Sequence, residues 1–257
     1  MPGIAATAVV DRGAELDTGV EVGPYAIIGP HVRIDQGTTV GAHAYLDGRT
    51  EIGPNCRIFP HAVVGTETQD KKYRGGTTYL RIGAGTVIRE FATLNPGTAE
   101  GTETRVGRNC LLMAYSHVAH NCILGDHVIL ANAATLAGHI DLGDWAIVGG
   151  LTPIHQFVKI GAHAMIGGGS RIPQDVAPFT LVAGNPSRCY GMNVVGMERR
   201  GFSPESIRAV KQAYRILFRQ KLTVSEAVKR VKDEVPFTPE VKDLINFFLT
   251  SERGVTR

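Results

Sequence analysis

The sequence contains no long apolar run. Its 257 residues are 43% hydrophobic, but no stretch approaches the roughly 18 to 20 consecutive apolar residues of a membrane-spanning helix. The N-terminus also has no basic leader followed by an apolar segment, which argues against a secretory signal peptide. We therefore expect a protein of the cytoplasm that makes no stable insertion into a membrane.

The chain also carries little net charge, and its excess of positive charge lies in the C-terminal part. The formal net charge is +3. Residues 1–195 hold 14 Lys and Arg against 16 Asp and Glu, whereas residues 196–257 hold 13 against 8. This balance predicts an acidic partner or ligand for the C-terminal part, although a solvated helical face would produce the same pattern.

A period of six residues runs through most of the chain. Stepping by six from Ile4 to Ile172 finds Val, Ile or Leu at 26 of 29 positions. Neither the period of about 3.6 of an α-helix nor the period of 2 of an ordinary strand keeps such a phase. A prism whose coils each have three flat sides of six residues does keep a six-residue phase. The repeat therefore predicts a parallel β-helix with these aliphatic side chains pointing inward.

Small side chains usually stand two residues before each inward aliphatic. Three of the four cysteines, Cys56, Cys110 and Cys122, occupy this position. We predict that they fill the core and form neither disulfides nor a zinc site. Cys189 lies outside the repeat and has no assigned role.

The repeat is interrupted at residues 65–81 and 95–105. Both stretches are polar and glycine-rich, so we expect two loops that leave a rigid scaffold. Functional residues often lie on such loops, and the first contains the cluster QDKKY at residues 69–73. A tolerated insertion is the alternative for each loop.

The pattern becomes helical after the repeat ends, which predicts a β-helix over residues 1–195 and an α-helical domain over 196–257. Ser203-Pro204, Thr223 with Glu226, and Thr238-Pro239 are typical starts of three helices. These helices can cover the open end of the β-helix, which would otherwise expose unpaired backbone.

Several histidines share one edge of the predicted prism. Residues 18 positions apart lie above one another on successive coils, at a spacing of about 4.8 Å. On this grid the polar side chains that gather along one edge are His117, His120, His139, His155 and Gln156.

Three interpretations of this edge stay open from the residues alone. The histidines can be solvated surface groups, or ligands of a zinc ion shared between subunits. They can also serve acyl transfer, in which a neutral histidine takes a proton from a hydroxyl while a backbone N–H in a glycine turn stabilises the oxyanion. Gly138, beside His120, offers such a turn.

The order of motifs resembles one acyltransferase family. The matching segments are residues 69–73 (QDKKY), 117–122 (HVAHNC), 130–139 (LANAATLAGH), 149–157 (GGLTPIHQF), 183–186 (AGNP) and 199–202 (RRGF). Together they are similar to the acyl-carrier-protein:UDP-N-acetylglucosamine O-acyltransferases of lipid A biosynthesis. The likeness covers essentially the whole chain, whereas the six-residue repeat alone is shared by many acyltransferases.

The resemblance implies a left-handed β-helix, a homotrimer and active sites between subunits. It makes His120 the general base that deprotonates the sugar 3-hydroxyl, and Gly138 the oxyanion-hole amide. It implies that the sugar nucleotide is bound by Asp70, Lys72, His117, His139, His155, Gln156, Asn193 and Arg199. It implies no metal and no cofactor, because the acyl carrier protein thioester is a substrate.

The resemblance also implies an acyl groove that includes Gly150 and Gly168, where small residues leave room for a longer chain. Exposed basic residues of the C-terminal part would suit an acidic carrier protein, and no nucleic acid is expected as a partner. These basic residues are Arg208, Lys211, Arg215, Arg219 and Lys221.

Two positions depart from the family pattern. Asn121 stands where an aspartate is expected beside the base, and Val195 stands where a polar residue can contact the nucleotide. Other enzymes on this scaffold remain as alternatives. They are an N-acyltransferase that acts on a glucosamine derivative, whose family usually adds an N-terminal domain, and a zinc-dependent lyase.

Overall fold

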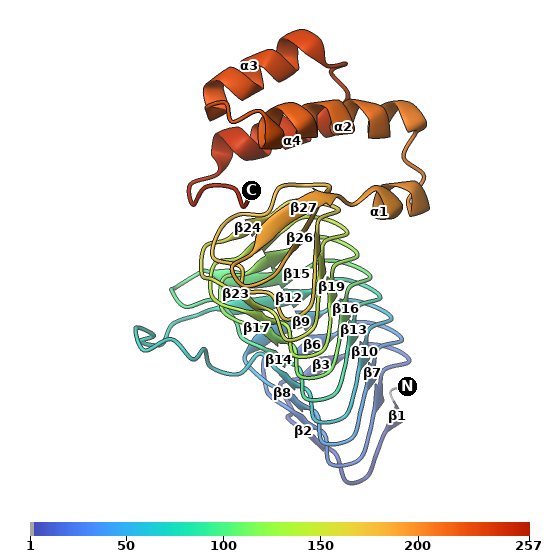
Figure 1. The fold of residues 1–257 in the computed structure, drawn as a ribbon. Helices are drawn as coiled ribbons and strands as arrows, with labels where there is room; N and C mark the ends of the chain where they lie inside the picture. Colours follow the sequence, from blue (N-terminus) through green and yellow to red (C-terminus); the bar gives the residue numbers. More distant parts are fainter. Residues whose placement is uncertain (1–2) are drawn as a thin grey trace.

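The computed structural model describes residues 3–257. Parallel strands form three sheets, which are the faces of a triangular prism (Figure 1). We name the faces first, second and third in the order in which the chain reaches them. The first corner joins the first face to the second, the second corner joins the second to the third, and the third corner leads back to the first.

As far as residue 166 each face contains every third strand along the chain, and the last two strands, the second of which is antiparallel to the first, then complete the first face. The first face consists of β1 (Gly3–Ile4), β4 (Glu21–Val22), β7 (Thr39–Val40), β10 (Arg57–Ile58), β13 (Val87–Ile88), β16 (Leu111–Leu112), β19 (Ile129–Leu130), β22 (Ile147–Val148), β25 (Met165–Ile166), β26 (Thr180–Ala183) and β27 (Arg188–Met192). The second face consists of β2 (Val9–Val10), β5 (Ile27–Ile28), β8 (Tyr45–Leu46), β11 (Val63–Val64), β14 (Thr93–Leu94), β17 (His117–Val118), β20 (Thr135–Leu136) and β23 (Pro153–Ile154). The third face consists of β3 (Glu15–Leu16), β6 (Arg33–Ile34), β9 (Arg49–Ile52), β12 (Tyr79–Ile82), β15 (Glu103–Val106), β18 (Ile123–Leu124), β21 (Asp141–Leu142) and β24 (Lys159–Ile160).

The register of these strands follows the six-residue repeat. Val118 pairs with Leu136, and Leu136 pairs with Ile154, so residues 18 apart lie on adjacent coils. All three side chains are buried. The predicted parallel β-helix with an inward aliphatic column is therefore confirmed.

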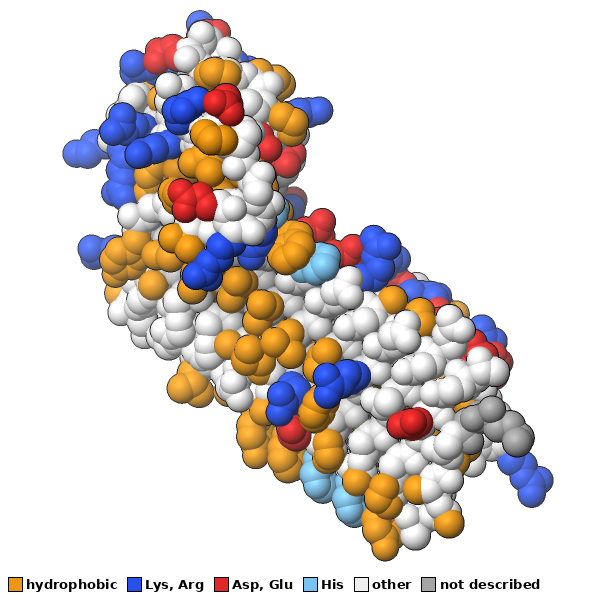
Figure 2. Space-filling view, turned by 90° about the vertical axis from the view of Figure 1, so that its right-hand side faces the viewer, with side chains coloured by type: hydrophobic (Ala, Val, Ile, Leu, Met, Phe, Trp, Pro, Cys, Tyr) orange, Lys and Arg blue, Asp and Glu red, His pale blue; other side chains and the backbone are white. Residues whose placement is uncertain are grey.

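The outer surfaces of the faces differ in chemistry. The third face carries ion pairs, in which Arg81 bridges Glu51 and Glu103. The upper part of the first face is apolar instead, and Figure 2 shows hydrophobic side chains gathered there below the helical region. Its outward side chains are Val87, Leu111, Ile129, Ile147, Met165 and Leu181. This face is suited to contact with another protein surface.

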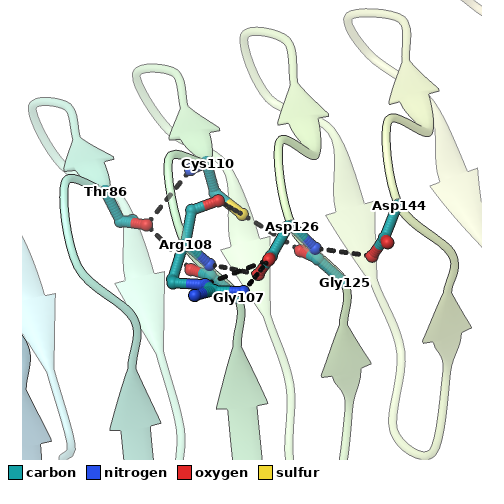
Figure 3. A network of polar contacts seen from close by, with 7 residues as sticks. All are labelled: Thr86, Gly107, Arg108, Cys110, Gly125, Asp126 and Asp144. Carbon is teal, nitrogen blue, oxygen red and sulfur yellow. Dashed lines mark hydrogen bonds and ion pairs between the residues drawn. The ribbon is translucent and has the colours of Figure 1, made fainter.

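Side-chain hydrogen bonds link successive coils at the third corner (Figure 3). Asp126 accepts hydrogen bonds from the Arg108 backbone N–H, at 2.7 Å, and from the Arg108 guanidinium. Asp144 accepts one from the Asp126 N–H at 2.8 Å. Each carboxylate thus accepts a hydrogen bond from a backbone N–H at the corner that is not paired within the parallel sheets.

The three repeat cysteines are buried in the core, as predicted. Each also donates a hydrogen bond from Sγ to a carbonyl further along the chain, and the distance is 3.3 Å for Cys56, 3.3 Å for Cys110 and 3.1 Å for Cys122. Burial raises the pKa of the Cys110 thiol to about 11 and that of Cys122 to about 12. These thiols therefore stay protonated at neutral pH.

The two interruptions of the repeat are loops, and both leave the prism at the second corner. The first joins β11 to β12 over residues 65–78, and the second joins β14 to β15 over residues 95–102. Both are three residues shorter than expected, because β12 and β15 are four-residue strands that pair along their full length. The first loop stands out from the side of the prism in Figure 1.

The C-terminal part contains four helices, one more than predicted. They are α1 (Val194–Arg199), α2 (Pro204–Arg219), α3 (Val224–Glu234) and α4 (Pro239–Thr250). The predicted caps Ser203, Thr223 and Thr238 each accept a hydrogen bond from a first-turn N–H. Helix α1 was missed because its β-branched residues and Gly196 have low helix propensity. Within residues 3–257 no helix is long and apolar enough to span a membrane.

The helical region packs on the last coil of the β-helix. Ala177 and Phe179 share one apolar cluster with Val210, Leu217 and Phe248 of the helices. Below this cluster, β26 and β27 close the first face. The helices thus cover the end of the prism, as Figure 1 shows.

Candidate active site

His120 lies at the second corner, in the turn after β17, and only 7% of it is exposed. Its Nδ1 is 3.0 Å from Asn121 Oδ1, and its Nε2 is 3.6 Å from Asp70 Oδ2. An acceptor at Nδ1 favours the tautomer with its proton on Nδ1 and a lone pair on Nε2. His120 can therefore accept a proton through Nε2.

Asp70 reaches His120 from the first loop. Its other carboxylate oxygen, Oδ1, accepts a hydrogen bond of 2.8 Å from the Lys72 backbone N–H. The buried Asn95 side chain donates to two carbonyls at the start of this loop, at 3.1 and 3.2 Å, and so anchors it. The loop thereby holds a carboxylate beside the buried imidazole, with the exposed side chain of Lys72 two residues away.

Gly138 packs against the imidazole from the next coil. A Cβ atom built at Gly138 would lie 2.5 Å from His120 Nε2, so only glycine lets the ring rest on this turn. The Gly138 carbonyl accepts a hydrogen bond from Phe157, whereas its N–H has no acceptor within residues 3–257. This amide can therefore donate to an oxygen atom of a ligand held beside His120.

Two further histidines flank His120. The ring of His139 meets His120 edge to face at 5.1 Å and stacks on Phe157. His117 Nδ1 lies 2.7 Å from Thr93 Oγ1 on the second face. Burial lowers the pKa of both flanking histidines, and repulsion from His120 lowers each further. Both are therefore neutral at pH 7, and each offers one donor and one acceptor to a ligand rich in hydroxyl groups.

Gln156 and His155 occupy the same corner one coil beyond Gly138. Gln156 is half-buried and His155 is exposed, with His155 Nδ1 3.0 Å from the Gln156 carbonyl. The structure thus brings the five residues predicted at this edge to the second corner, or to the adjoining edge of the second face, and adds Asp70 to them.

Asn193 and Arg199 lie away from the second corner of the same chain. Asn193 is buried at the start of α1, where its Oδ1 accepts from the Gly196 N–H and its Nδ2 donates to the His163 carbonyl at the third corner. Arg199 is exposed at the end of α1. Beside it, Arg200 covers the Trp145 ring at 5.0 Å. One chain therefore does not bring these residues to His120.

Gly150 and Gly168 form a third group, at the first corner. They stack on successive coils, and a Cβ at Gly168 would lie 3.2 Å from the Gly150 carbonyl oxygen. Gly150 is packed in the same way on Asn132, at 3.0 Å. At these two stacked positions the corner therefore carries no side chain, although the adjacent Leu151 is exposed.

Three residues of the site were not predicted from the sequence. Asn95 anchors the first loop, Thr93 contacts His117, and Thr98 Oγ1 donates a hydrogen bond of 2.9 Å to Asn121 Oδ1. None belongs to a recognisable motif. Only the interruption of the repeat at residue 95 indicated that this stretch differs from the scaffold.

Two family models match the chain. Residues 103–138 match the bacterial transferase hexapeptide model of six repeats. Residues 175–256 match the model for domain 2 of UDP N-acetylglucosamine O-acyltransferase. The two matches fall on the β-helix and mainly on the helical region, respectively.

Full-length relatives carry one name. An acyl-[acyl-carrier-protein]–UDP-N-acetylglucosamine O-acyltransferase of Paracidovorax citrulli is 52% identical over 262 residues, covering 100% of both chains. One from Thermodesulfovibrio yellowstonii is 47% identical over 98% of each chain. The solved UDP-N-acetylglucosamine acyltransferase of Bacteroides fragilis superimposes with a TM-score of 0.96 at 37% identity, over 98% of this chain and 99% of that one.

Proposed function

The chain belongs to the family of acyl-[acyl-carrier-protein]–UDP-N-acetylglucosamine O-acyltransferases, and on this premise we propose how its residues carry out the reaction. The protein transfers an acyl chain from acyl carrier protein to UDP-N-acetylglucosamine in lipid A biosynthesis. The comparisons do not favour the N-acyltransferase or the zinc lyase. We place the reaction at the second corner, in the cytoplasm.

His120 is the general base of this proposal. Its Nε2 takes the proton of the sugar 3-hydroxyl while the hydroxyl oxygen attacks the thioester carbonyl carbon. The tetrahedral intermediate then collapses, the carbon–sulfur bond breaks, and the carrier-protein thiolate takes the proton back from His120. The Nδ1 contact to Asn121, which leaves the Nε2 lone pair free, is the observation that carries this role.

Gly138 supplies the oxyanion contact. Its N–H has no acceptor within residues 3–257 and lies on the turn that touches the His120 ring. A donor placed there stabilises the negative charge that develops on the thioester oxygen. Base and donor thus act on the two reacting groups at once.

The remaining residues of the second corner bind the sugar nucleotide in this proposal. Asp70 lies 3.6 Å from Nε2 of the base and the ring of His139 meets the base edge to face, while the neutral His117 and His139 suit the hydroxyl groups of a sugar. Lys72 contributes positive charge from the same loop, whereas Gln156 and His155 extend the polar surface by one coil.

Asn193 and Arg199 join the site through a neighbouring subunit. They lie on the side of the prism next to the apolar part of the first face, which suits contact with another copy of the chain. A cyclic homotrimer has head-to-tail interfaces, so it can bring this surface of one chain to the second corner of the next. Arg199 would then face the nucleotide phosphates.

The acyl chain lies along the column of Gly150 and Gly168 in the same assembly. The absence of a side chain at these two stacked positions leaves room for methylene groups at the first corner, beside the exposed Leu151. The acyl donor approaches from the helical region, where Figure 2 shows Lys and Arg side chains gathered. The exposed basic residues on and after α2 that would attract an acidic carrier protein are Arg208, Lys211, Arg215, Arg219 and Lys221.

One assay tests the proposal. Purified protein is offered UDP-N-acetylglucosamine together with a panel of acyl carrier protein thioesters, and products are identified by mass. We expect 3-O-acylated product with at least one 3-hydroxyacyl thioester, and a rate at least about 100-fold lower for His120→Ala. Failure of every thioester to give product, or an undiminished rate in His120→Ala, would overturn it.

A further inference from the structure

The Asn121 side chain is shared between the base and the second loop. Its Oδ1 lies 3.0 Å from His120 Nδ1 and 2.9 Å from Thr98 Oγ1. Thr98 is half-buried in the loop of residues 95–102, which leaves the prism at the same corner as the loop that carries Asp70.

The orientation of this amide decides the tautomer of the base. When Oδ1 of Asn121 faces His120, the imidazole proton sits on Nδ1 and Nε2 keeps its lone pair. A reversed amide would donate from Nδ2 to the Nδ1 lone pair, and the ring proton would move to Nε2. The carboxylate of Asp70, 3.6 Å from Nε2, attracts a proton to that nitrogen and so favours the unproductive form. A neutral Asn121 therefore needs a group that holds its oxygen toward His120.

We propose that Thr98 is a positioning residue for acyl transfer, whose hydroxyl holds the Asn121 oxygen toward His120. The inference rests on the proposed function and extends it to the second loop. Thr98 Oγ1 has no other acceptor within residues 3–257, so among these residues only the oxygen-facing amide accepts its proton.

The backbone conformation of Asn121 is already held in place, so only the orientation of its side-chain amide remains to be determined. Its φ of 58° lies in the left-handed region, which Asn and Asp tolerate better than most residues. Its N–H donates to Thr104 Oγ1 at 2.8 Å. An aspartate at position 121 would keep this backbone, and its two equivalent oxygens would accept from His120 in either orientation.

A double-mutant cycle tests the inference. Thr98→Val removes the hydroxyl at nearly constant shape, Thr98→Ser retains it, and Asn121→Asp or Asn121→Ala removes the need for orientation. We expect Thr98→Val to lower kcat about 3- to 10-fold, the loss of one neutral hydrogen bond, with KM for both substrates within about 2-fold. Thr98→Ser should restore kcat. In either Asn121 background, Thr98→Val should change kcat less than about 2-fold.

The outcome separates orientation from simple anchoring of the loop. An equal loss of kcat from Thr98→Val in all backgrounds, or no loss in the Asn121 protein, would overturn the inference. The proposed function is judged independently, because product formation by the unmodified protein and its loss in His120→Ala do not depend on Thr98.

Discussion

Gly138 and His120 are packed so closely that residue 138 can carry no side chain. The His120 ring occupies the space of a Cβ at this position. The base and the oxyanion donor are therefore fixed relative to each other by contact between two neighbouring coils, and both coils belong to the rigid core of the β-helix.

Replacing Gly138 by Ala should damage the reaction more than the fold. The added methyl group must displace the imidazole or the turn, so we expect kcat to fall at least about 100-fold. Overpacking of this kind typically costs about 1 to 3 kcal/mol of stability. Steady-state kinetics and thermal unfolding measure the two effects. Gly191→Ala is the matched control, because a Cβ at Gly191 meets nothing within 4 Å. Unchanged kcat in Gly138→Ala would contradict the placement of the oxyanion site.

Two inactive variants should restore each other if the site is shared between subunits. His120→Ala lacks the base and Arg199→Ala lacks the residue assigned to the neighbouring chain. In trimers reassembled from an equal mixture, about a quarter of the sites contain both intact groups, because heterologous contacts fix the order of the chains. We expect up to about a quarter of the unmodified activity after mixing and refolding. Residues that acted within one chain would give no recovery.

Acid should destabilise the junction between the β-helix and the helices through His163. Burial lowers the pKa of His163 to about 4, and the charge of Arg200 adds to the effect, whereas an unfolded histidine titrates near about 6.5. Between these values the unfolded chain binds a proton that the folded chain does not. The free energy of unfolding should therefore decrease as the pH falls from about 6.5 to 4, on the order of 2 kcal/mol.

Urea unfolding at several pH values between 4 and 7.5 measures this decrease. His163→Gln cannot titrate and should flatten the profile in this window. If the variant and the unmodified protein lost equal stability over this range, His163 would not be responsible.

All four cysteines should resist alkylation in the folded protein. They are buried, and burial raises the pKa of each thiol. Since the thiolate is the reactive species, iodoacetamide at pH 7.5 should label none of them until the protein is unfolded. Mass spectrometry before and after denaturation reads the result. Fast labelling of Cys110 or Cys122 in the native protein would contradict their place in the core.

The scaffold was predictable because its signal is repeated. A single inward position such as Leu136 says little, but the same phase over the whole repeat determines which side chains face the core. The histidine edge followed from the same grid. Gln156 lies two coils of 18 beyond His120, His139 and His155 are each one residue from this column, and His117 lies three residues before His120. The pairing of His117 with Thr135 shows the register of 18.

The contacts made by the loops could not be predicted in this way. Thr98 and Asp70 reach His120 through segments that have no repeat, so their positions depend on the folded path of each loop. Asn193 was missed as a helix cap because Val194 and Val195 resemble a strand. Its distance from His120 within one chain follows from the order of the faces around the prism, which a linear repeat does not reveal.

The exit of both loops from one corner also determines where the sequence can vary in length. At the other corners each coil rests directly on the next, and an inserted residue would break hydrogen bonds such as those of Asp126 and Asp144. The second corner already accommodates extra residues on two coils. Evolution of this chain can therefore lengthen, shorten or recompose the segments around the base without remodelling the scaffold, so a new acceptor specificity would arise through these loops.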